Sequence, residues 1–107
     1  ENVFINEAGL ALIDFDDAGF GYRGYDLGVP MSQHYTLRYL GDLIAAIQTG
    51  YGTLRKAPSI EDIKFFLMLR CFASSGWVIS RQAKKSPTQR RYAERALHMA
   101  HQWLTTP

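Results

Sequence analysis

Two short apolar runs open the chain and predict a β-hairpin. Residues 3–5 and 10–13 consist almost entirely of β-forming or small apolar side chains, and the four residues between them include Asn6 and Gly9. Asn and Gly tolerate the positive φ angles that tight reversals need. Residues 15–24 contain three glycines and few helix-forming residues, so they predict an irregular loop.

From residue 25 onward the apolar positions recur at helical spacing. Asp26 has the chemistry of an N-cap for a helix that runs to about His34, because its carboxylate can accept hydrogen bonds from first-turn amides. A second helix is predicted to end near Gly50 or Gly52. Its apolar positions, three and four residues apart, are Tyr39, Leu40, Leu43, Ile44 and Ile47.

Two further helices complete the prediction. Ser59 begins a capping-box-like segment with Asp62 in the place of the usual Glu, and the helix that follows, towards Trp77, is apolar on most of its circumference. It should therefore be the buried central helix. Ser86 and Pro87 precede the last helix. The expected fold class is α+β and mainly α, with a β-hairpin followed by about four helices.

Composition narrows the setting. The 107 residues are 47% hydrophobic and 21% charged, a globular balance. No uninterrupted apolar run approaches the roughly 20 residues of a membrane span, so we expect no membrane partner. Cys71 is the only cysteine, which excludes an intramolecular disulfide and a multi-cysteine metal site. These features favour a reducing, cytoplasmic location.

Charge is distributed unevenly. Residues 1–53 hold seven acidic and two basic residues, a net −5, whereas residues 54–107 hold ten basic and three acidic residues, a net +7. The basic half interleaves its charges with large apolar side chains, as solvated helix faces do, so we expect no nucleic-acid partner.

The acidic loop after the second apolar run carries the chemistry. Asp14, Asp16 and Asp17 place three carboxylates within four residues. Oxygen ligands without neighbouring Cys or His favour a hard cation such as Mg²⁺. A hairpin closed at residues 6–9 brings Asn2 opposite or near Asp14, and an Asn amide and an Asp carboxylate are the groups with which kinases hold their metals. The alternative is structural: a loop carboxylate, Asp17 above all, can be a turn former, and Asp26 a helix cap.

These residues resemble the aminoglycoside phosphotransferase and choline kinase family, which has a kinase-like fold. In that family a strand ending in I-D-[FW]-[DE] is followed by a glycine-containing loop and then by Y-D-[LI]-[AG]. Residues 13–16 read Ile-Asp-Phe-Asp and residues 25–28 read Tyr-Asp-Leu-Gly, while residues 2–5 resemble the end of the catalytic loop H-x-D-x-x-x-x-N. The close match spans residues 2–28.

The resemblance implies specific roles. Asn2 and Asp14 would hold Mg²⁺ with the phosphates of ATP, or of GTP; Asp16 and Asp17 would border the acceptor site; and Asp26 would brace the catalytic loop, a structural duty. The catalytic Asp would lie five residues before Asn2, outside this chain, so no catalytic residue is assigned within it. The glycine-rich nucleotide loop and its lysine are also outside it, and the chain by itself is not expected to turn over ATP.

The whole chain is then expected to be part of a C-terminal lobe, with a metal-binding hairpin and loop at residues 1–24 and a helical subdomain at 25–107. Its partners would be a nucleotide and a small molecule with a hydroxyl group, cationic or not. Trp77 and Tyr92 are candidates for the wall of an acceptor pocket. The alternative is a non-catalytic helical module for binding or assembly, and a lone lobe would expose apolar surface that a homodimer could cover.

Overall fold

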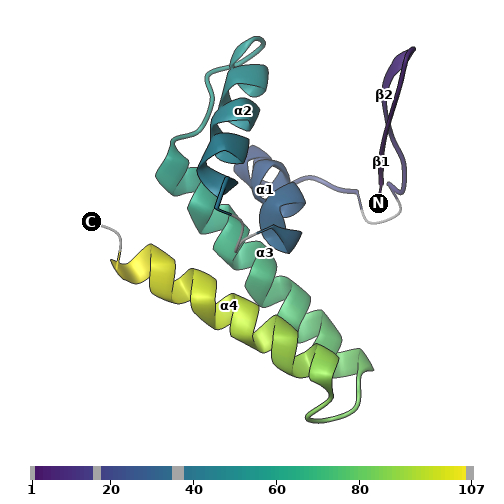
Figure 1. Cartoon of the computed structure of the whole chain (residues 1–107), viewed down its shortest axis with the longest axis vertical. Coiled ribbons are helices and arrows are strands. Elements are labelled where there is room, and N and C mark those ends of the chain that lie inside the picture. Colours follow the sequence, from purple (N-terminus) through teal and green to yellow (C-terminus); the bar gives the residue numbers. More distant parts are fainter. Residues whose placement is uncertain (1, 16–17, 35–37, 106–107) are drawn as a thin grey trace.

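The computed structural model describes residues 2–15, 18–34 and 38–105. Two strands lead into the helices, which occupy most of the chain (Figure 1). The elements are β1 (Val3–Asn6), β2 (Gly9–Leu12), α1 (Arg23–Gly28), the 3₁₀ helix η1 (Val29–Gln33), α2 (Leu40–Gly52), α3 (Ile60–Arg81) and α4 (Pro87–Thr105). The predicted fold class, a hairpin followed by four α-helices, is confirmed.

The hairpin has the predicted register and turn. β1 and β2 are antiparallel, with Val3 paired to Leu12 and Asn6 to Gly9. Gly9 has a φ of +127°, a conformation that costs other residues strain, and the Asn6 side-chain oxygen accepts a hydrogen bond from the Ala8 amide at 2.9 Å. The turn chemistry read from the sequence therefore fixes which residues face each other.

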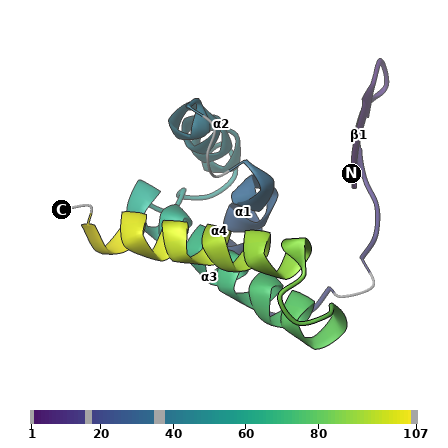
Figure 2. The ribbon, with the colours of Figure 1, turned by 60° about the horizontal axis from the view of Figure 1, so that its bottom comes forward.

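The hairpin stands apart from the helices in both views (Figures 1 and 2). Every residue of β1 and β2 is exposed, including Phe4 and Leu12, each more than half accessible. A two-stranded hairpin is only marginally stable alone, so contacts with the helices or with further chain would be needed to stabilise it. Within the described residues it does not lean on the helices.

The first helix begins earlier than predicted. α1 begins at Arg23, its N-cap is Tyr22 without a side-chain cap, and Asp26 lies inside its first turn. The prediction that Asp26 caps this helix is wrong, because the chain is already helical three residues before it. The helix also changes to 3₁₀ geometry at Val29, where Pro30 follows and cannot donate a backbone hydrogen bond.

The other three helices match their predictions. α2 ends at Gly52, and the hydroxyl oxygen of Ser59 accepts a hydrogen bond from the Asp62 amide at 3.0 Å at the start of α3. Ser86 does the same for the Gln89 amide at 3.1 Å, next to the start of α4. N-cap side chains satisfy amides that have no partner within the helix, and this is why the Ser positions mark the helix starts so well.

The core forms where α3 meets its neighbours. α3 packs most extensively against α4 and α1, and it also contacts η1 and α2 (Figure 1). The buried cluster comprises Met31, Ile44, Ile63, Leu67, Met68, Cys71, Ala96 and Met99. The prediction of a central apolar helix is confirmed in position, although α3 also keeps Phe72, Trp77 and Ile79 exposed.

Two glycines let α1 approach α3 at backbone distance. A Cβ at Gly28 would lie 2.6 Å from the Leu67 backbone nitrogen, and one at Gly24 would lie 2.6 Å from two ring carbons of Phe66. Gly24 and Gly28 are four residues apart and therefore share one face of α1. The Tyr-Asp-Leu-Gly step of the sequence thus places its final glycine directly on the central helix.

By length and composition α3 could also cross a membrane, with a mean hydropathy of 1.3 in its most apolar window. The search for uninterrupted apolar runs did not identify α3, because isolated polar residues interrupt its apolar sequence. The core helix of a globular protein meets the same test, and α3 contributes Ile63, Leu67 and Cys71 to the buried cluster. This property is weak evidence for a membrane segment.

Candidate functional site

The structure brings the two predicted metal ligands together. Asn2 precedes β1 and Asp14 follows β2, and the Asn2 side-chain nitrogen lies 3.5 Å from one carboxylate oxygen of Asp14. The strand ladder continues past β1 and β2, because the Ile13 amide donates to the Asn2 carbonyl at 3.1 Å. Backbone pairing thus holds the two side chains at the open end of the hairpin.

An unusual backbone conformation aims Asp14 at Asn2. Directly paired residues of an antiparallel ladder project to the same face, and the next residue along an extended strand projects to the other. Asn2 pairs with Ile13, so an extended Asp14 would point away from Asn2. Instead Asp14 has a φ of 68°, in the left-handed region. Asp tolerates this region better than most residues, at a cost of about 1 kcal/mol, and such strain is typical of functional positions.

The donor set fits a magnesium ion in its chemistry and spacing. An octahedral ion with oxygens at about 2.1 Å holds neighbouring ligand oxygens about 3 Å apart. The 3.5 Å separation of the Asn2 and Asp14 side-chain atoms is close to this, and it is long for a direct hydrogen bond. Rotation of the Asn2 amide by half a turn exchanges its nitrogen for its oxygen. The pair could then present two oxygens to one cation.

This pair is exposed and small. Asn2 and Asp14 are both solvent-accessible, and the described residues contain no group of three or more acidic, His or Cys side chains that could hold a metal. Mg²⁺ commonly takes only one or two protein oxygens and completes its shell with water and substrate phosphates. Two ligands therefore suit an ion that arrives with a nucleotide.

The other acidic positions are not part of this pair. Asp16 and Asp17, predicted to border an acceptor site, lie outside the described residues. Asp26 is exposed on α1, and its carboxylate makes no hydrogen bond or ion pair with any described residue. The bracing role that the family resemblance implies for Asp26 therefore has no contact partner in this part of the chain.

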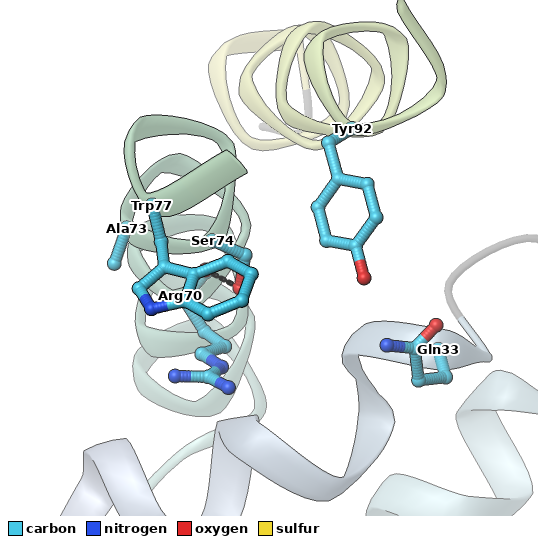
Figure 3. Close-up of a pocket in the computed structure, with 6 residues that line it drawn as sticks. All are labelled: Gln33, Arg70, Ala73, Ser74, Trp77 and Tyr92. Atoms are coloured by element: carbon cyan, nitrogen blue, oxygen red, sulfur yellow. Dashed lines mark hydrogen bonds between the residues drawn. The ribbon is translucent and has the colours of Figure 1, made fainter. Parts of the chain in front are cut away.

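A second feature is a cavity of about 460 Å³ between α3, α4 and the end of η1 (Figure 3). Trp77 and Tyr92, named from the sequence as candidate pocket walls, both line it. The same cavity is also lined by Arg70, Ser74 and Gln33, which were not predicted from the sequence. The signal was present for two of them: residues 70, 74 and 77 follow the three- and four-residue spacing of one helix face.

The residues behind the cavity carry buried polar groups. Arg95 is only 4% exposed, and one of its terminal nitrogens donates to the Ser32 carbonyl at 3.0 Å. Cys71 is fully buried, and this burial raises the pKa of its thiol. The positive charges of Arg95 and, to a smaller extent, Arg70 act in the opposite direction and lower the pKa, but burial has the larger effect. A raised pKa keeps the thiol protonated and inert, so Cys71 acts as a core side chain.

The sequence matches one known family. Residues 1–63 match APH, the phosphotransferase enzyme family, and this segment runs from the hairpin to the first turn of α3. No curated protein and no solved structure matches the chain. The matched segment exceeds half of the 107 residues and contains Asn2, Asp14 and the Tyr-Asp-Leu-Gly step. The chain therefore belongs to the phosphotransferase enzyme family.

Proposed function

We propose that this chain supplies the metal-binding hairpin of a small-molecule kinase, which transfers the γ-phosphoryl group of ATP or GTP to a hydroxyl group of a small acceptor. The observation that carries the proposal is the convergence of Asn2 and Asp14, which depends on the left-handed backbone at Asp14. Family membership supports phosphoryl transfer as the reaction class.

The two side chains have distinct tasks in this proposal. Asp14 contributes a full negative charge, which attracts the ion, and Asn2 contributes a neutral oxygen that fixes the ion's position along the hairpin. Bound there, Mg²⁺ would neutralise charge on the nucleotide's phosphates. The hairpin's own part is orientation, because its backbone ladder holds both ligands side by side at its open end.

The acceptor side of the proposal rests on the acidic loop. Asp16 and Asp17 lie two and three residues after Asp14, so an acceptor bound beside the metal would meet negative charge. A cationic or hydroxyl-rich small molecule suits such a rim. The general base for the acceptor hydroxyl is not assigned to any residue of this chain.

Paramagnetic broadening by Mn²⁺, a close substitute for Mg²⁺, tests the metal assignment in the ¹⁵N-labelled chain. We expect Mn²⁺ to broaden the amide signals at the open end of the hairpin, including Val3 and Ile13. Asp14→Asn should abolish this broadening, since Asn keeps the size and the tolerance for positive φ but loses the charge. Asp42→Asn, on exposed α2 surface, removes the same charge elsewhere and should behave as wild type.

Calorimetric titration with MgATP then tests the nucleotide. We expect a binding heat for the wild type and for Asp42→Asn, and a much smaller heat for Asp14→Asn. If Asp14→Asn binds Mn²⁺ and MgATP as the wild type does, the assignment of Asp14 as a metal ligand is wrong. The helical-module alternative would then account better for the chain.

A further inference from the structure

The cavity between α3, α4 and η1 has the size and lining of a small-ligand site. Its volume of about 460 Å³ falls within the range of pockets that hold small molecules. Figure 3 shows Trp77 and Arg70 on the α3 side, and Tyr92 reaching from α4 with its hydroxyl toward Gln33. Two aromatic walls and a few polar groups are the usual composition of a ligand pocket.

Arg70 gives the cavity an unsatisfied positive charge. Its Nε is buried without a hydrogen-bond partner, and its guanidinium makes no hydrogen bond or ion pair with any described residue. None of the described residues that line the cavity is acidic. A guanidinium presents five donors, and leaving buried donors unpaired costs about 1–3 kcal/mol each. Such a group has the chemistry to bind an anion.

Arg95 strengthens the positive field from behind the aromatic wall. Its guanidinium carbon lies 4.4 Å from the centre of the Tyr92 ring, and its Nε and Nη2 are buried without partners. With the described residues Arg95 makes one hydrogen bond, to the carbonyl of Ser32, which precedes Gln33 in the chain. Two guanidinium groups with unpaired donors therefore lie at or just behind one cavity.

The remaining polar groups favour an acceptor-rich ligand. The Ser74 hydroxyl donates to the Arg70 carbonyl at 2.8 Å, so its one hydrogen is already used. The Gln33 side chain has an amide group with two donors and lines the opposite side of the cavity. Donors thus face the cavity from both sides, from Arg70 and from Gln33, and the aromatic rings of Trp77 and Tyr92 supply flat apolar area.

We propose that this cavity binds a small planar anion, an aromatic ring that carries a carboxylate or phosphate group. The ring would lie against Trp77 and Tyr92, and the anionic group would accept hydrogen bonds from Arg70. Of the six described lining residues, four belong to α3 beyond the family-matched segment and Tyr92 belongs to α4, whereas Gln33 lies within that segment. The anion assignment rests on the side chains that this structure brings together. It is also independent of the metal site at the hairpin.

The indole N–H signals of the two tryptophans provide a direct readout by NMR. Trp77 lines the cavity. Trp103 packs against Phe65, with 5.4 Å between the ring centroids, and serves as an internal control. We expect phenyl phosphate and benzoate to shift the Trp77 signal in a saturable manner and to leave Trp103 in place. Benzyltrimethylammonium, with the same ring and the opposite charge, should shift neither signal. Inorganic phosphate should bind at least ten-fold more weakly than phenyl phosphate, because it lacks the ring.

Matched arginine variants identify the anion contact. Arg70→Met should lower the affinity for phenyl phosphate at least ten-fold, and Arg70→Gln should do the same. Arg55→Met removes an exposed arginine in the connection between α2 and α3 and should bind as the wild type does. The urea midpoint of Arg70→Met should stay equal to or above that of the wild type, because the lost guanidinium has a buried unpaired donor.

Four results would overturn the proposal. The first is that no probe shifts the Trp77 signal at millimolar concentration, and the second is that the cationic probe shifts it equally. The third is that inorganic phosphate binds with the same affinity as phenyl phosphate. The fourth is that a folded Arg70 variant keeps the wild-type affinity for phenyl phosphate. Because the readout needs neither Mg²⁺ nor nucleotide, its failure is separate from failure of the proposed kinase function.

Discussion

The hairpin of this protein carries the candidate metal site, whereas the helical core carries the buried apolar side chains that stabilise the fold. The hairpin carries the Asn2–Asp14 pair, yet all eight residues of its strands are exposed and backbone pairing to each other is their main support. The helical core buries apolar side chains from η1, α2, α3 and α4 in one cluster. Burial of apolar surface dominates folding free energy, so the helices should fold with little help from the hairpin.

In this chain the candidate metal ligands that resemble the family lie on its least buried part. The residues that the sequence marks most clearly, Asn2, Asp14 and their neighbours, sit on the least buried element. The proposed metal site must be open to an ion and a nucleotide, and this exposure removes the packing that would stabilise the same residues. The hairpin and the core should therefore respond very differently to the same kind of mutation.

The largest contrast is expected from truncating one leucine in each region. Leu67 is fully buried on α3, and Leu67→Ala should lower the free energy of unfolding by about 2–5 kcal/mol, because it creates a cavity in the core. Leu12 is 55% exposed on β2, and Leu12→Ala should lower it by less than about 0.5 kcal/mol. Urea denaturation followed by helical circular dichroism measures both.

Amide hydrogen exchange extends this comparison. The α3 amides should exchange only through global unfolding, whereas those of β1 and β2 should exchange with little protection. A Leu12→Ala variant as destabilised as Leu67→Ala would show that the hairpin and the helices form one cooperative unit.

The next effect concerns the contact between α1 and α3. Gly28→Ala should lower the free energy of unfolding by about 1–3 kcal/mol, because the new methyl group would meet the backbone of Leu67, which cannot rotate away. Gly76→Ala is the matched control: Gly76 is also helical, and its added Cβ meets nothing within 4 Å. It should raise stability by about 0.5–1 kcal/mol through helix propensity.

Thermal unfolding of the two glycine variants gives the comparison directly, with midpoints displaced in opposite directions. Equal midpoints would mean that α1 can move away from α3 without cost, and that the close approach of Gly28 does not contribute to the core.

The sequence predicted the elements whose signals are local. The turn at Asn6 and Gly9 and the serine caps of α3 and α4 each depend on residues a few positions apart, and all were found where expected. The start of α1 was not, because Asp26 looks like a cap in isolation and nothing local marks Tyr22 as the boundary. Periodicity also overstated the burial of α3, since an apolar side chain becomes buried only where another element covers it.

The candidate sites divide in the same way. The hairpin register placed Asn2 near Asp14 from the sequence alone, but the left-handed conformation that turns Asp14 towards Asn2 could not be read from a list of residues. Arg95 was not predicted, because the carbonyl that accepts its hydrogen bond belongs to Ser32, 63 residues away in the chain. The meeting of Gln33 with Arg70 and Tyr92 is likewise a property of helix packing and not of any local pattern.

The smallest expected effect is a pH dependence of the protein's stability that comes from the buried Cys71 thiol. Burial raises the pKa of the Cys71 thiol, so the folded protein disfavours the thiolate. The thiol's contribution to stability is complete below its unfolded pKa, about 8.5, and is lost progressively as the pH rises above it. The stability difference between wild type and Cys71→Ala should therefore shrink from pH 8 to pH 10. Urea midpoints of the two proteins measured across this range test it, and titration of tyrosines and lysines cancels because both proteins share them. If the stability difference stays constant with pH, unfolding does not change the environment of Cys71. The centre of α3 would then not be buried more firmly than the exposed hairpin.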